Sequence, residues 1–584
     1  MQRTATCGQL QKQNEGQTVI LNGWVHRDRD HGGIHFINLR DRYGITQVVV
    51  AEQLKDIVKE LHSEYCIAVK GIVRLRPASM VNPQMVTGEI EVEAQKIEIL
   101  STCELPPFVI DEETDAKEET RLRYRYLDLR SAGMQKRIKL RHEFIKAIRD
   151  FLCERDFYEI ETPTLIRSTP EGARDFLVPS RLQRGKFYAL PQSPQLLKQI
   201  LMVGGFDKYF QIARCYRDED ARGDRQPEFT QLDLEMSFVK RDDVLLLMEQ
   251  LFNDVFKKVL NVELPANFQR LSWAEAMNTY GVDKPDLRYG LPLVDVKDLV
   301  SRSSFTTFKE IIDSGGAIKA LKAPASTTVA YSRKFIGELE EAAKVYGAKG
   351  LAWMKVGPNN SLEGGISKFF GNLEAELITT MEASEGDMLL FVGDSWKTTC
   401  ASLGAVRVKL AKQLELYRDD EFAFCWIIDF PLFEFNEEEQ RWEAAHHMFS
   451  MPQGQYIDSM EKDPGSVIGD LYDLVLNGNE IASGSIRIHD IELQKRVFRI
   501  CGIDDEEAQK RFGFLLNAFR YGPPPHGGIA PGIDRIVMLM AGQNSIKEVI
   551  AFPKNNAAIS PMDESPSSVD QKQLDELHLI IQSE

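Results

Sequence analysis

The first hundred residues alternate apolar and polar positions in short runs, a pattern typical of β-strands with one buried face. Turn-like residues separate five such runs: TVILNGWVHRDRD, GIHFINLRD, ITQVVV, CIAVKGIVRLR and EIEVEAQKIEIL. One helix is expected after the third run, at AEQLKDIVKELH (51–62). This order predicts a small closed barrel of the OB type over residues 1–103, a fold that often presents a strand face to single-stranded nucleic acid. Phe36 on the second run is either core or exposed for stacking on a base.

A helical pattern begins at Gln135, where apolar residues recur three or four positions apart as far as Leu152. A short strand closed by Pro163 is expected next. Residues 217–237, RDEDARGDRQPEFTQLDLEMS, then combine many charges with a two-residue alternation from Phe229 onward. Because KYFQIARCY just before them is rich in aromatic and β-branched residues, we expect a long antiparallel hairpin. Its polar residues form a patch of fixed donors and acceptors if they share a face; a solvated hairpin tip is the alternative.

Further along, the texture of the chain changes between about residues 286 and 420. This segment is rich in Gly, Ala, Ser and Lys, alternates helices with strands and carries no charged site motif, which indicates an inserted domain. Afterwards the aromatic run FAFCWIIDFPLFEF predicts a strand, and the stretches DLYDLVLNGNEIASGSIRIHD and PPHGGIAPGIDRIVMLM predict further strands with polar faces.

Composition limits the classes of function. The 584-residue chain has a net charge of −17, which argues against indiscriminate binding to polyanions. The basic run RLRYRYLDLRSAGMQKRIKLR (121–141) is typical of a solvated helix face or a linker, although such a patch can also serve a specific RNA. No window reaches the roughly 18 to 20 apolar residues of a membrane span, and the eight scattered cysteines have no zinc spacing. We therefore expect a cytoplasmic protein that does not enter a membrane.

The stretch GGIAPGIDRIVMLM (527–540) predicts a glycine-rich strand that runs into a helix. Arg535 would lie in the first turn of that helix, where the helix dipole makes a cation unfavourable by up to about 1 kcal/mol. A bound polyanion would offset this cost, and a nearby carboxylate would do the same. Together with Arg217, Arg535 would be able to clamp a phosphate chain from two sides.

Asp473 and Glu480 are carboxylates of the kind that magnesium prefers together with phosphate oxygens. Their seven-residue spacing puts them on opposite faces of a regular strand, so they meet only if the turn at Asn477-Gly478 brings them together. His446 and the histidine after it have no partner at zinc spacing, which favours an orienting or proton-sharing role. The absence of GxGxxG, Walker A and GxSxG patterns disfavours dehydrogenases, P-loop ATPases and α/β-hydrolases.

Three longer motifs follow one another along the chain: RHEFIKAIRDFLCERDFYEIETPTL, FQIARCYRDEDARGDRQPEFTQLDLEMSF and GGIAPGIDR. In this order they resemble the signature motifs of class II aminoacyl-tRNA synthetases. With PQSPQLLKQ (191–199) and the N-terminal barrel, nearly the whole chain resembles the aspartyl-tRNA synthetase family of bacterial type. The resemblance implies a multidomain α+β protein divided as follows: OB-fold anticodon-binding domain 1–103, hinge 104–135, antiparallel-sheet catalytic domain 136–285 and 421–558, inserted GAD-type domain 286–420, and C-terminal extension 559–584.

The same resemblance implies an activity and its partners. L-aspartate and ATP would give aspartyl-adenylate, and the aspartyl group would then move to the 3′ end of tRNA(Asp). Magnesium would accompany ATP, and a homodimer would form largely through the first motif. Catalysis would come from positioning and charge neutralisation, because the aspartate carboxylate attacks phosphorus without a protein nucleophile.

Roles for individual residues also follow from the resemblance. The expected catalytic residues are Arg217, Gln231 and Arg535. The expected ATP-binding residues are Arg217, Asp218, Glu219, Gln226, Phe229, Glu480, Gly532, Ile533, Asp534 and Arg535. The expected aspartate-binding residues are Glu171, Ser193, Gln195, Lys198, Arg217, Asp233, His446 and Arg487. Asp473 and Glu480 would hold magnesium, and the anticodon contacts would be Arg29, Phe36, Gln47 and Glu91.

The chain departs from the family pattern at two places. Met448 replaces the usual proline of HHPF, which would loosen the histidine loop. In the barrel, His31 and Ser79 stand where enzymes restricted to tRNA(Asp) tend to carry Leu and Lys. His31 with its neighbouring glycines resembles the non-discriminating enzymes, so we hypothesise that tRNA(Asn) is also aspartylated, which would link the chain functionally to an amidotransferase.

Three alternatives remain open from the sequence. The chain could be strictly specific for tRNA(Asp). It could be a non-catalytic protein whose barrel binds single-stranded RNA, which predicts no ATP–pyrophosphate exchange with any amino acid. It could also be a class II relative with another substrate: an asparaginyl or lysyl enzyme, or an asparagine-forming amide ligase. Lys198 opposes a lysine substrate through like-charge repulsion, the barrel opposes a free-standing amide ligase, and asparagine is the hardest rival to exclude.

Overall fold

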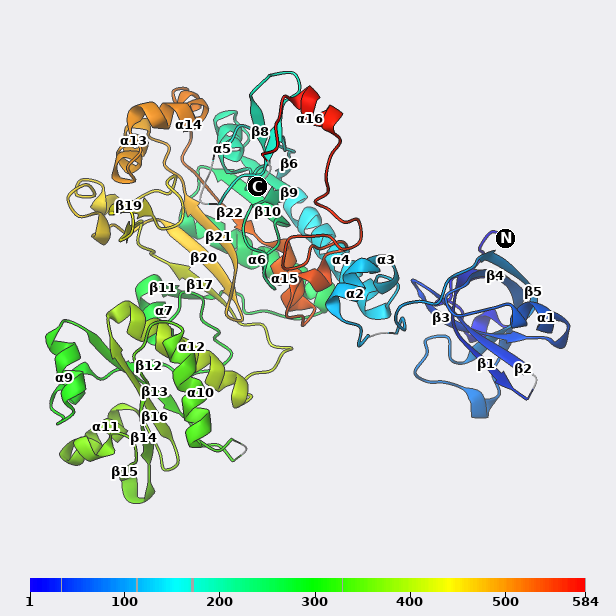
Figure 1. Ribbon diagram of the computed structural model, residues 1–584, viewed down its shortest axis with the longest axis horizontal. Coiled ribbons are helices and arrows are strands. Elements are labelled where there is room, and N and C mark those ends of the chain that lie inside the picture. The colour runs from blue at the N-terminus through cyan, green and yellow to red at the C-terminus, as the bar shows by residue number, and fades with distance from the viewer. Residues whose placement is uncertain (33, 112–113, 170–172, 328, 583–584) are drawn as a thin grey trace. The chain divides into compact units, whose positions relative to one another are not determined.

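The computed structural model describes residues 1–32, 34–111, 114–169, 173–327 and 329–582. It divides into two compact units (Figure 1). The first unit contains Met1–His142, Asp220–Gln226 and Ser545–Val569, and the second contains Glu143–Glu219, Pro227–Asn544 and Asp570–Glu584. Each unit is described by itself below.

The N-terminal part of the first unit is a closed five-stranded barrel with strand order β1-β2-β3-β5-β4. Its elements are β1 (Thr18–His31), β2 (Ile34–Asp41), β3 (Gly44–Val50), α1 (Lys55–Lys59), β4 (Cys66–Leu75) and β5 (Ile90–Ser101), with short 3-10 turns η1 (Lys12–Asn14), η2 (Glu52–Leu54) and η3 (Ala78–Met80). Alternate strand residues such as Val25, Ile37 and Val48 are fully buried in the barrel core. The predicted OB barrel, including a helix after the third strand, is confirmed.

The basic run that follows the barrel is not simply a solvated face. It forms α2 (Glu118–Arg123), α3 (Arg125–Asp128) and the first half of α4 (Ala132–Cys153). Arg121 makes ion pairs with Asp128 and with Glu548 near η9 (Ile546–Val549), and Arg125 is 2% exposed. The guanidinium of Arg125 donates to the backbone carbonyls of residues 547, 550 and 551. These arginines therefore hold the chain together within the first unit.

The second unit contains an eight-stranded, mostly antiparallel sheet of order β11-β17-β20-β21-β22-β10-β9-β6. The strands are β6 (Tyr158–Glu159), β9 (Lys208–Tyr216), β10 (Glu228–Ser237), β11 (Gln269–Ser272), β17 (Phe424–Ile428), β20 (Leu471–Leu476), β21 (Asn479–Ile486) and β22 (His526–Pro531). The helices associated with it are α5 (Gln195–Val203), α6 (Arg241–Leu260), α7 (Trp273–Tyr280), α13 (Ile491–Ile500), α14 (Asp505–Phe519) and α15 (Ile533–Met540). This sheet carries most of the candidate site.

A second sheet in this unit lies between β11 and β17 in the sequence and has the order β12-β13-β16-β14-β15. Its elements are β12 (Leu293–Asp295), α8 (Lys297–Ser301), α9 (Thr306–Asp313), β13 (Ala317–Ala323), α10 (Arg333–Lys344), β14 (Ala352–Val356), η4 (Pro358–Asn360), β15 (Leu362–Glu363), η5 (Ser367–Phe369), η6 (Gly371–Leu373), α11 (Glu374–Thr380), β16 (Met388–Asp394) and α12 (Trp396–Gln413). Residues of α8, α9 and α11 cover one face, while those of α10 and α12 cover the other (Figure 1). The expected boundaries of an inserted domain, like the other domain boundaries, stay a prediction.

Smaller elements complete the fold. They are β7 (Leu177–Pro179), β8 (Phe187–Ala189), β18 (Phe433–Asn436), β19 (Arg441–Ala444), η7 (Gly454–Tyr456), η8 (Pro464–Ser466) and α16 (Gln571–Leu577). The prediction of one strand for FAFCWIIDFPLFEF was wrong: the run forms β17 in the large sheet and β18 in a separate two-stranded sheet. Asp429 has a φ of +58° between them, and a proline follows two residues later. This backbone conformation ends the first strand and redirects the chain.

Candidate active site

The charged hairpin has the predicted antiparallel form. Strands β9 and β10 pair from Tyr216 opposite Glu228 to Lys208 opposite Met236. The backbone N–H of Arg217 donates to the carbonyl of Pro227 at 2.8 Å, which continues the pairing by one residue. The Arg217 guanidinium lies 5.0 Å from the ring centroid of Phe229, and both side chains are half-buried. The hairpin therefore presents a cation next to an aromatic face, while Asp218 and Glu219 are exposed beside them.

Four completely buried ions form the polar core of the site. The ammonium of Lys198, from α5, donates to Asp233 at 2.8 Å and lies 3.2 Å from Glu235. The Nε of Arg487, just after β21, donates to Glu235 at 3.0 Å. All four side chains are at most 1% exposed, so they form two cations and two carboxylates in balance. Glu235 was missed by the sequence reading, although the two-residue alternation of β10 places it on the same face as Asp233.

The remaining N–H groups of Arg487 are also engaged. Nη1 donates to His447 Nε2 at 2.8 Å and to the Ser485 hydroxyl at 2.6 Å, and Nη2 donates to Glu235 and to the carbonyl of Gly528, both at 3.3 Å. Burial, followed by the charge of Arg487, holds the pKa of His447 well below its usual range. A neutral imidazole is therefore the acceptor for Arg487.

Two buried polar atoms around this cluster have no hydrogen-bond partner among the described residues: Asp233 Oδ2 and Gln195 Nε2. Gln195 begins α5, and its backbone N–H donates to the Ser193 hydroxyl at 3.3 Å. Gln231, two residues before Asp233 on β10, accepts from the Cys215 thiol at 3.3 Å. Because buried polar groups without partners are costly, these atoms point to a missing ligand with both donors and acceptors.

The two predicted metal carboxylates are brought to one face by the turn between their strands. Asn477 and Gly478 link β20 to β21 with φ values of +49° and +77°, as in a tight hairpin turn. The register runs from Leu476 opposite Asn479 to Val475 opposite Glu480, and then shifts by one residue. Because Glu480 is opposite Val475, and Val475 lies two residues from Asp473 on β20, Glu480 and Asp473 share a face; the register shift comes only after Glu480.

The electrostatics of this pair fit a cation site. Burial and the charge of Asp473 both raise the pKa of Glu480, and Asp473 Oδ1 is buried without a partner among the described residues. His446 lies 3.4 Å from the other oxygen of Asp473; burial lowers the pKa of this histidine, but the hydrogen bond and the charge of Asp473, together with the charge of Glu480, raise it above its usual value. No group of three His, Cys, Asp or Glu residues able to hold a metal occurs in the described parts of the chain. Phosphate oxygens would therefore have to complete the ligand set of a metal bound by Asp473 and Glu480.

Helix α15 begins at Ile533, as the glycine-rich motif predicted. Arg535 donates to the backbone carbonyl of Glu480, so the arginine and the carboxylate pair belong to the same end of the site. Asp534 is 4% exposed and accepts from the backbone N–H of Thr230 at 2.7 Å, which fixes α15 against β10. The side chain of Ile533 is completely buried. At Ile533 and Asp534, only the backbone is therefore placed to contact a ligand.

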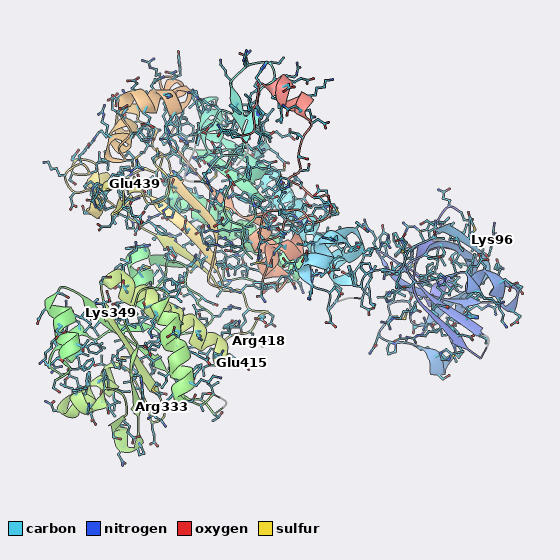
Figure 2. The ribbon with its side chains drawn as sticks, in the orientation of Figure 1. Lys96, Arg333, Lys349, Glu415, Arg418 and Glu439 are labelled. Carbon is cyan, nitrogen blue, oxygen red and sulfur yellow. The ribbon has the colours of Figure 1, made fainter. Side chains whose placement is uncertain are left out.

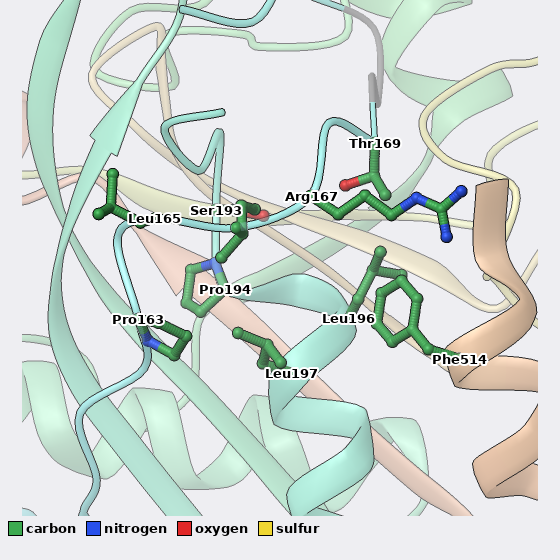
Figure 3. Close-up of a pocket in the computed structure, with 10 residues that line it drawn as sticks. Pro163, Leu165, Arg167, Thr169, Ser193, Pro194, Leu196, Leu197 and Phe514 are labelled. Atoms are coloured by element: carbon green, nitrogen blue, oxygen red, sulfur yellow. The ribbon is translucent and has the colours of Figure 1, made fainter. Parts of the chain in front are cut away.

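A cavity of about 370 Å³ lies beside the amino-acid end (Figure 3). Its wall is mainly apolar, with Pro163, Leu165 and Leu197 on one side and Phe514 on the other. Ser193, an expected site residue, contributes a hydroxyl group to this wall.

Comparisons with known proteins agree with this geometry. The family described as "tRNA synthetases class II (D, K and N)" matches residues 117–556, and the OB-fold nucleic acid binding domain matches residues 19–100. The chain belongs to the class II tRNA synthetases of the D, K and N group.

Two relatives of this class II synthetase match it over almost their full length. The aspartate–tRNA(Asp/Asn) ligase of Treponema denticola is 64% identical, with 100% of this chain and 99% of the relative covered. The protein of the same name from Treponema pallidum is 54% identical, with 99% and 97% covered. A solved structure, asparaginyl-tRNA synthetase from Pyrococcus horikoshii complexed with asparaginyl-adenylate, has a TM-score of 0.59 and 19% identity, covers 95% of this chain and 98% of its own, and shows the fold alone.

The barrel of this synthetase gathers the expected anticodon residues on its outer face. Phe36 is half-buried and pairs across from Arg29, whereas its neighbour Ile37 points into the core. The open choice for Phe36 is thereby decided against the core. The Gln47 amide, on β3, donates to Glu91, on β5, at 3.0 Å. Strand β3 pairs with β2, and strand β5 pairs with β4.

The two residues that suggested relaxed specificity are both exposed. The His31 ring, at the end of β1, makes an edge contact with Phe36 at a centroid distance of 6.1 Å, while Ser79 lies in η3. Arg76 was missed by the sequence reading: it is 7% exposed, burial lowers its pKa, and Nη2 is buried without a described partner. The charge of Glu91 acts on this guanidinium. No periodic signal marks a buried arginine in a loop after a strand.

Two expected site residues and the substituted position 448 need separate mention. Glu171 lies outside the described residues. Gln226 is 6% exposed, and its amide exchanges two hydrogen bonds with the backbone of Lys554, so its side chain already serves as a structural clamp within the first unit. The carbonyl of Met448 accepts from the Gln494 amide at 2.7 Å, and its side chain packs beside two apolar clusters. The expected loosening of the histidine loop stays a prediction.

Proposed function

We propose that the chain is an aspartate–tRNA ligase, which activates L-aspartate with ATP to aspartyl-adenylate and transfers it to the 3′ end of tRNA. The observation that carries this proposal is the buried pair of cations, Lys198 and Arg487, held by Asp233 and Glu235. A pocket for a dicarboxylic amino acid needs fixed cations for the side chain and acceptors for the ammonium group. The names of the two Treponema relatives support the same substrate.

At the amino-acid end, Lys198 and Arg487 bind the side-chain carboxylate, and the unpartnered Asp233 oxygen receives the substrate ammonium together with Ser193, Gln195 and Glu171. Because every N–H of Arg487 already has a partner, the incoming carboxylate must replace one of them. The neutral acceptors His447 and Ser485 give way before Glu235 does, because only Glu235 adds the attraction of an opposite charge to its hydrogen bonds with Arg487.

At the ATP end, the adenine stacks on Phe229, with Glu219 and the hairpin backbone beside it and the backbone of Gly532 to Asp534 opposite. Arg217 binds the α-phosphate, and Arg535 binds the γ-phosphate side. Asp473 and Glu480 would hold magnesium, which supplies charge neutralisation for the triphosphate. The unpartnered Asp473 oxygen and the raised pKa of Glu480 support this placement.

In the first step an α-carboxylate oxygen of aspartate attacks the α-phosphorus, the bond to the bridging oxygen breaks, and pyrophosphate leaves with the electron pair. Gln231 and His446 lie beside the reacting carboxylate. Arg217 neutralises charge on the α-phosphate throughout, so the chain contributes positioning and electrostatics. A protein that only binds RNA through its barrel would show no aspartate-dependent ATP–pyrophosphate exchange.

We further propose that the enzyme charges tRNA(Asn) as well as tRNA(Asp), which would link it to an amidotransferase that converts the product. The exposed His31 beside Phe36 supports this, as do the Asp/Asn names of the relatives. Aspartylation of both purified transcripts should occur at comparable rates. A rate for tRNA(Asn) negligible beside that for tRNA(Asp) would leave the strictly tRNA(Asp)-specific enzyme in its place.

A homodimer is proposed because large apolar side chains are exposed around β6 and the β7–β8 hairpin. These include Tyr158 at 62%, Leu165 at 50%, Leu177 at 57% and Leu182 at 77% exposure. Large exposed apolar side chains become buried when they lie in an interface between two copies of the chain. Sedimentation at micromolar concentration should give twice the mass of the chain, and Leu177→Glu should shift it toward the monomer.

The eight free cysteines support a reducing cytoplasm as the compartment. No helix in the described part of the chain is long and apolar enough to cross a membrane.

A further inference from the structure

Two chain segments join the five-stranded sheet to the eight-stranded sheet, and we call them the stalk: residues 281–291 and 417–423. They are tied to each other. Arg288 pairs with Asp286 at 2.7 Å and donates to the carbonyl of Arg418 at 3.0 Å, and the rings of Tyr289 and Tyr417 stack at 5.7 Å. Arg418 marks the second segment in Figure 2. The stalk is therefore an ordered element with fixed side-chain contacts.

Helix α12 holds the first stalk segment in place. The guanidinium of Arg407, 0% exposed, donates to the carbonyls of Asp286, Tyr289, Gly290 and Leu291, at 2.9 to 3.2 Å. A buried arginine that donates to several carbonyls fixes the path of the backbone around it.

The stalk also holds the turn that carries the metal carboxylate. The Asn477 amide donates to the carbonyl of Glu421 at 2.7 Å and accepts from the backbone N–H of Ala423 at 2.8 Å. On the other side of the turn, a Cβ atom added to Gly478 would lie 3.2 Å from the Cβ of Asp286. Both stalk segments thus touch the turn two residues before Glu480.

Lys284 projects from this fixed loop two residues before Asp286. It is exposed and makes no hydrogen bond or ion pair in the described part of the chain. Asp286, on the same loop, lies against Gly478, and Gly478 is two residues before Glu480, so the loop that carries Lys284 borders the carboxylate end of the site.

We propose that Lys284 is a further catalytic residue, which binds the β- and γ-phosphates of ATP and neutralises the departing pyrophosphate. This inference rests on the proposed function, because it requires ATP to be cleaved between the α- and β-phosphates. The leaving group takes the electron pair of the broken bond and gains negative charge on its oxygens. A cation that is free before ATP arrives, on a rigid loop at the carboxylate end of the site, meets that charge without first breaking another ion pair.

A lysine suits this position for physical reasons. Its ammonium is a compact charge on a flexible stem with three donors, so it can follow the phosphate from substrate to product. Arg217 and Arg535, by contrast, are planar forks. The stalk adds the rigidity that an exposed loop would otherwise lack, because Asn477, Gly478 and Arg407 all contact it.

The test measures aspartate-dependent ATP–pyrophosphate exchange and, separately, pyrophosphate binding by calorimetry. Lys284→Gln should raise the KM for ATP and for pyrophosphate about tenfold and weaken pyrophosphate binding by a similar factor, as for the loss of one charge-assisted contact. The KM for aspartate should stay within about twofold. Lys284→Arg should restore most of the binding because it keeps the charge.

Lys349→Gln is the matched control. Lys349 is an exposed lysine beside α10 that makes no ion pair in the described part of the chain (Figure 2), so its loss changes the net charge equally. It should leave all constants unchanged. If Lys284→Gln keeps the KM values for ATP and pyrophosphate and the pyrophosphate affinity within twofold of the wild type, the inference is overturned while the proposed function stands. Absence of aspartate-dependent exchange in the wild type would instead overturn the proposed function itself.

Discussion

The two ends of the site are built in opposite ways. At the amino-acid end, Lys198 and Arg487 are each held by carboxylates within a fully buried cluster. At the phosphate end, the like-charged Asp473 and Glu480 lie on one face. Burial and the charge of Asp473 raise the pKa of Glu480. The cations of the amino-acid end are therefore paired with carboxylates before any ligand binds, whereas the like-charged carboxylates of the phosphate end gain an opposite charge only with their ligand.

This difference reflects what each end must recognise. A side-chain carboxylate must be told apart from a carboxamide of the same shape, and rigid, fully oriented cations make that choice. A triphosphate brings several negative charges and its own metal ion. The protein therefore needs to provide only the groups of opposite charge that bind the phosphates and the metal. The repulsion between the two carboxylates destabilises the free protein at the phosphate end, and the metal that accompanies ATP removes this repulsion.

The largest effect should come from breaking the balanced end. Arg487→Leu leaves Glu235 buried with only Lys198, which should lower aspartate-dependent exchange by about 10³-fold or more and reduce the free energy of unfolding by about 3–5 kcal/mol. Exchange kinetics and chemical denaturation measure the two effects. Arg496→Leu is the control. It removes a surface ion pair between Arg496, on α13, and Glu461, and should change neither the exchange rate nor the free energy of unfolding. Unchanged aspartate activation in Arg487→Leu would remove this residue from the substrate pocket.

The phosphate end should show the reverse relation between stability and activity. Glu480→Gln removes repulsion with Asp473 and should stabilise the fold by about 0.5–1 kcal/mol. It should also lower exchange by about 10²-fold at fixed magnesium and move the midpoint of a magnesium titration upward. The KM for aspartate should not change. A destabilised Glu480→Gln with a normal magnesium midpoint would mean that the two ends are not built differently.

A smaller effect is expected where the adenine stacks. Phe229→Ala removes the ring under Arg217 and should raise the KM for ATP about tenfold, as for the loss of one base–aromatic stack. The KM for aspartate should be unaffected. Phe435→Ala, on the exposed β18, serves as the control, and an equal response of the two variants would contradict the stacking role.

The smallest effect is a pH dependence of stability. Because the pKa of His447 is lowered in the folded protein, the unfolded chain binds its proton first, below about pH 6.5. Stability from this group is complete above that pH and is lost as pH falls toward the folded pKa. Between pH 6.5 and 5.5, His447→Gln should therefore lose up to about 1.4 kcal/mol less than the wild type. Parallel denaturation curves for the two proteins would contradict a neutral His447.

Local patterns along the chain were sufficient for much of the fold. The alternation in residues 18–100 predicted the barrel, the run from Phe229 predicted β10, and the glycines before Ile533 predicted the start of α15. Each of these elements has a period or a turn residue that acts over a few positions. The break after Ile428 was missed because aromatic residues continue across it, although Pro431 lies within the run.

The site was predicted less completely, for a related reason. The turn at Asn477 was anticipated, and it pairs Glu480 with Val475 on the face of Asp473, whereas the register shift beyond Glu480 is not visible in the spacing. Glu235 belongs to the site through its contacts with Lys198 and Arg487 from distant segments, and only the alternation of β10 indicated it. Gln226 was predicted to bind ATP, but its side-chain amide is already hydrogen-bonded to the backbone of Lys554.

The most direct test of the account is the amino-acid dependence of ATP–pyrophosphate exchange by the wild-type protein. With ATP and magnesium held constant, aspartate and asparagine are compared over the same concentration range, with lysine as a further competitor. The buried, oriented cations predict that kcat/KM for aspartate exceeds that for asparagine by about 10³-fold or more, and that lysine gives no exchange. Comparable exchange with asparagine, or none with aspartate, would contradict the proposed function and the comparison built on it.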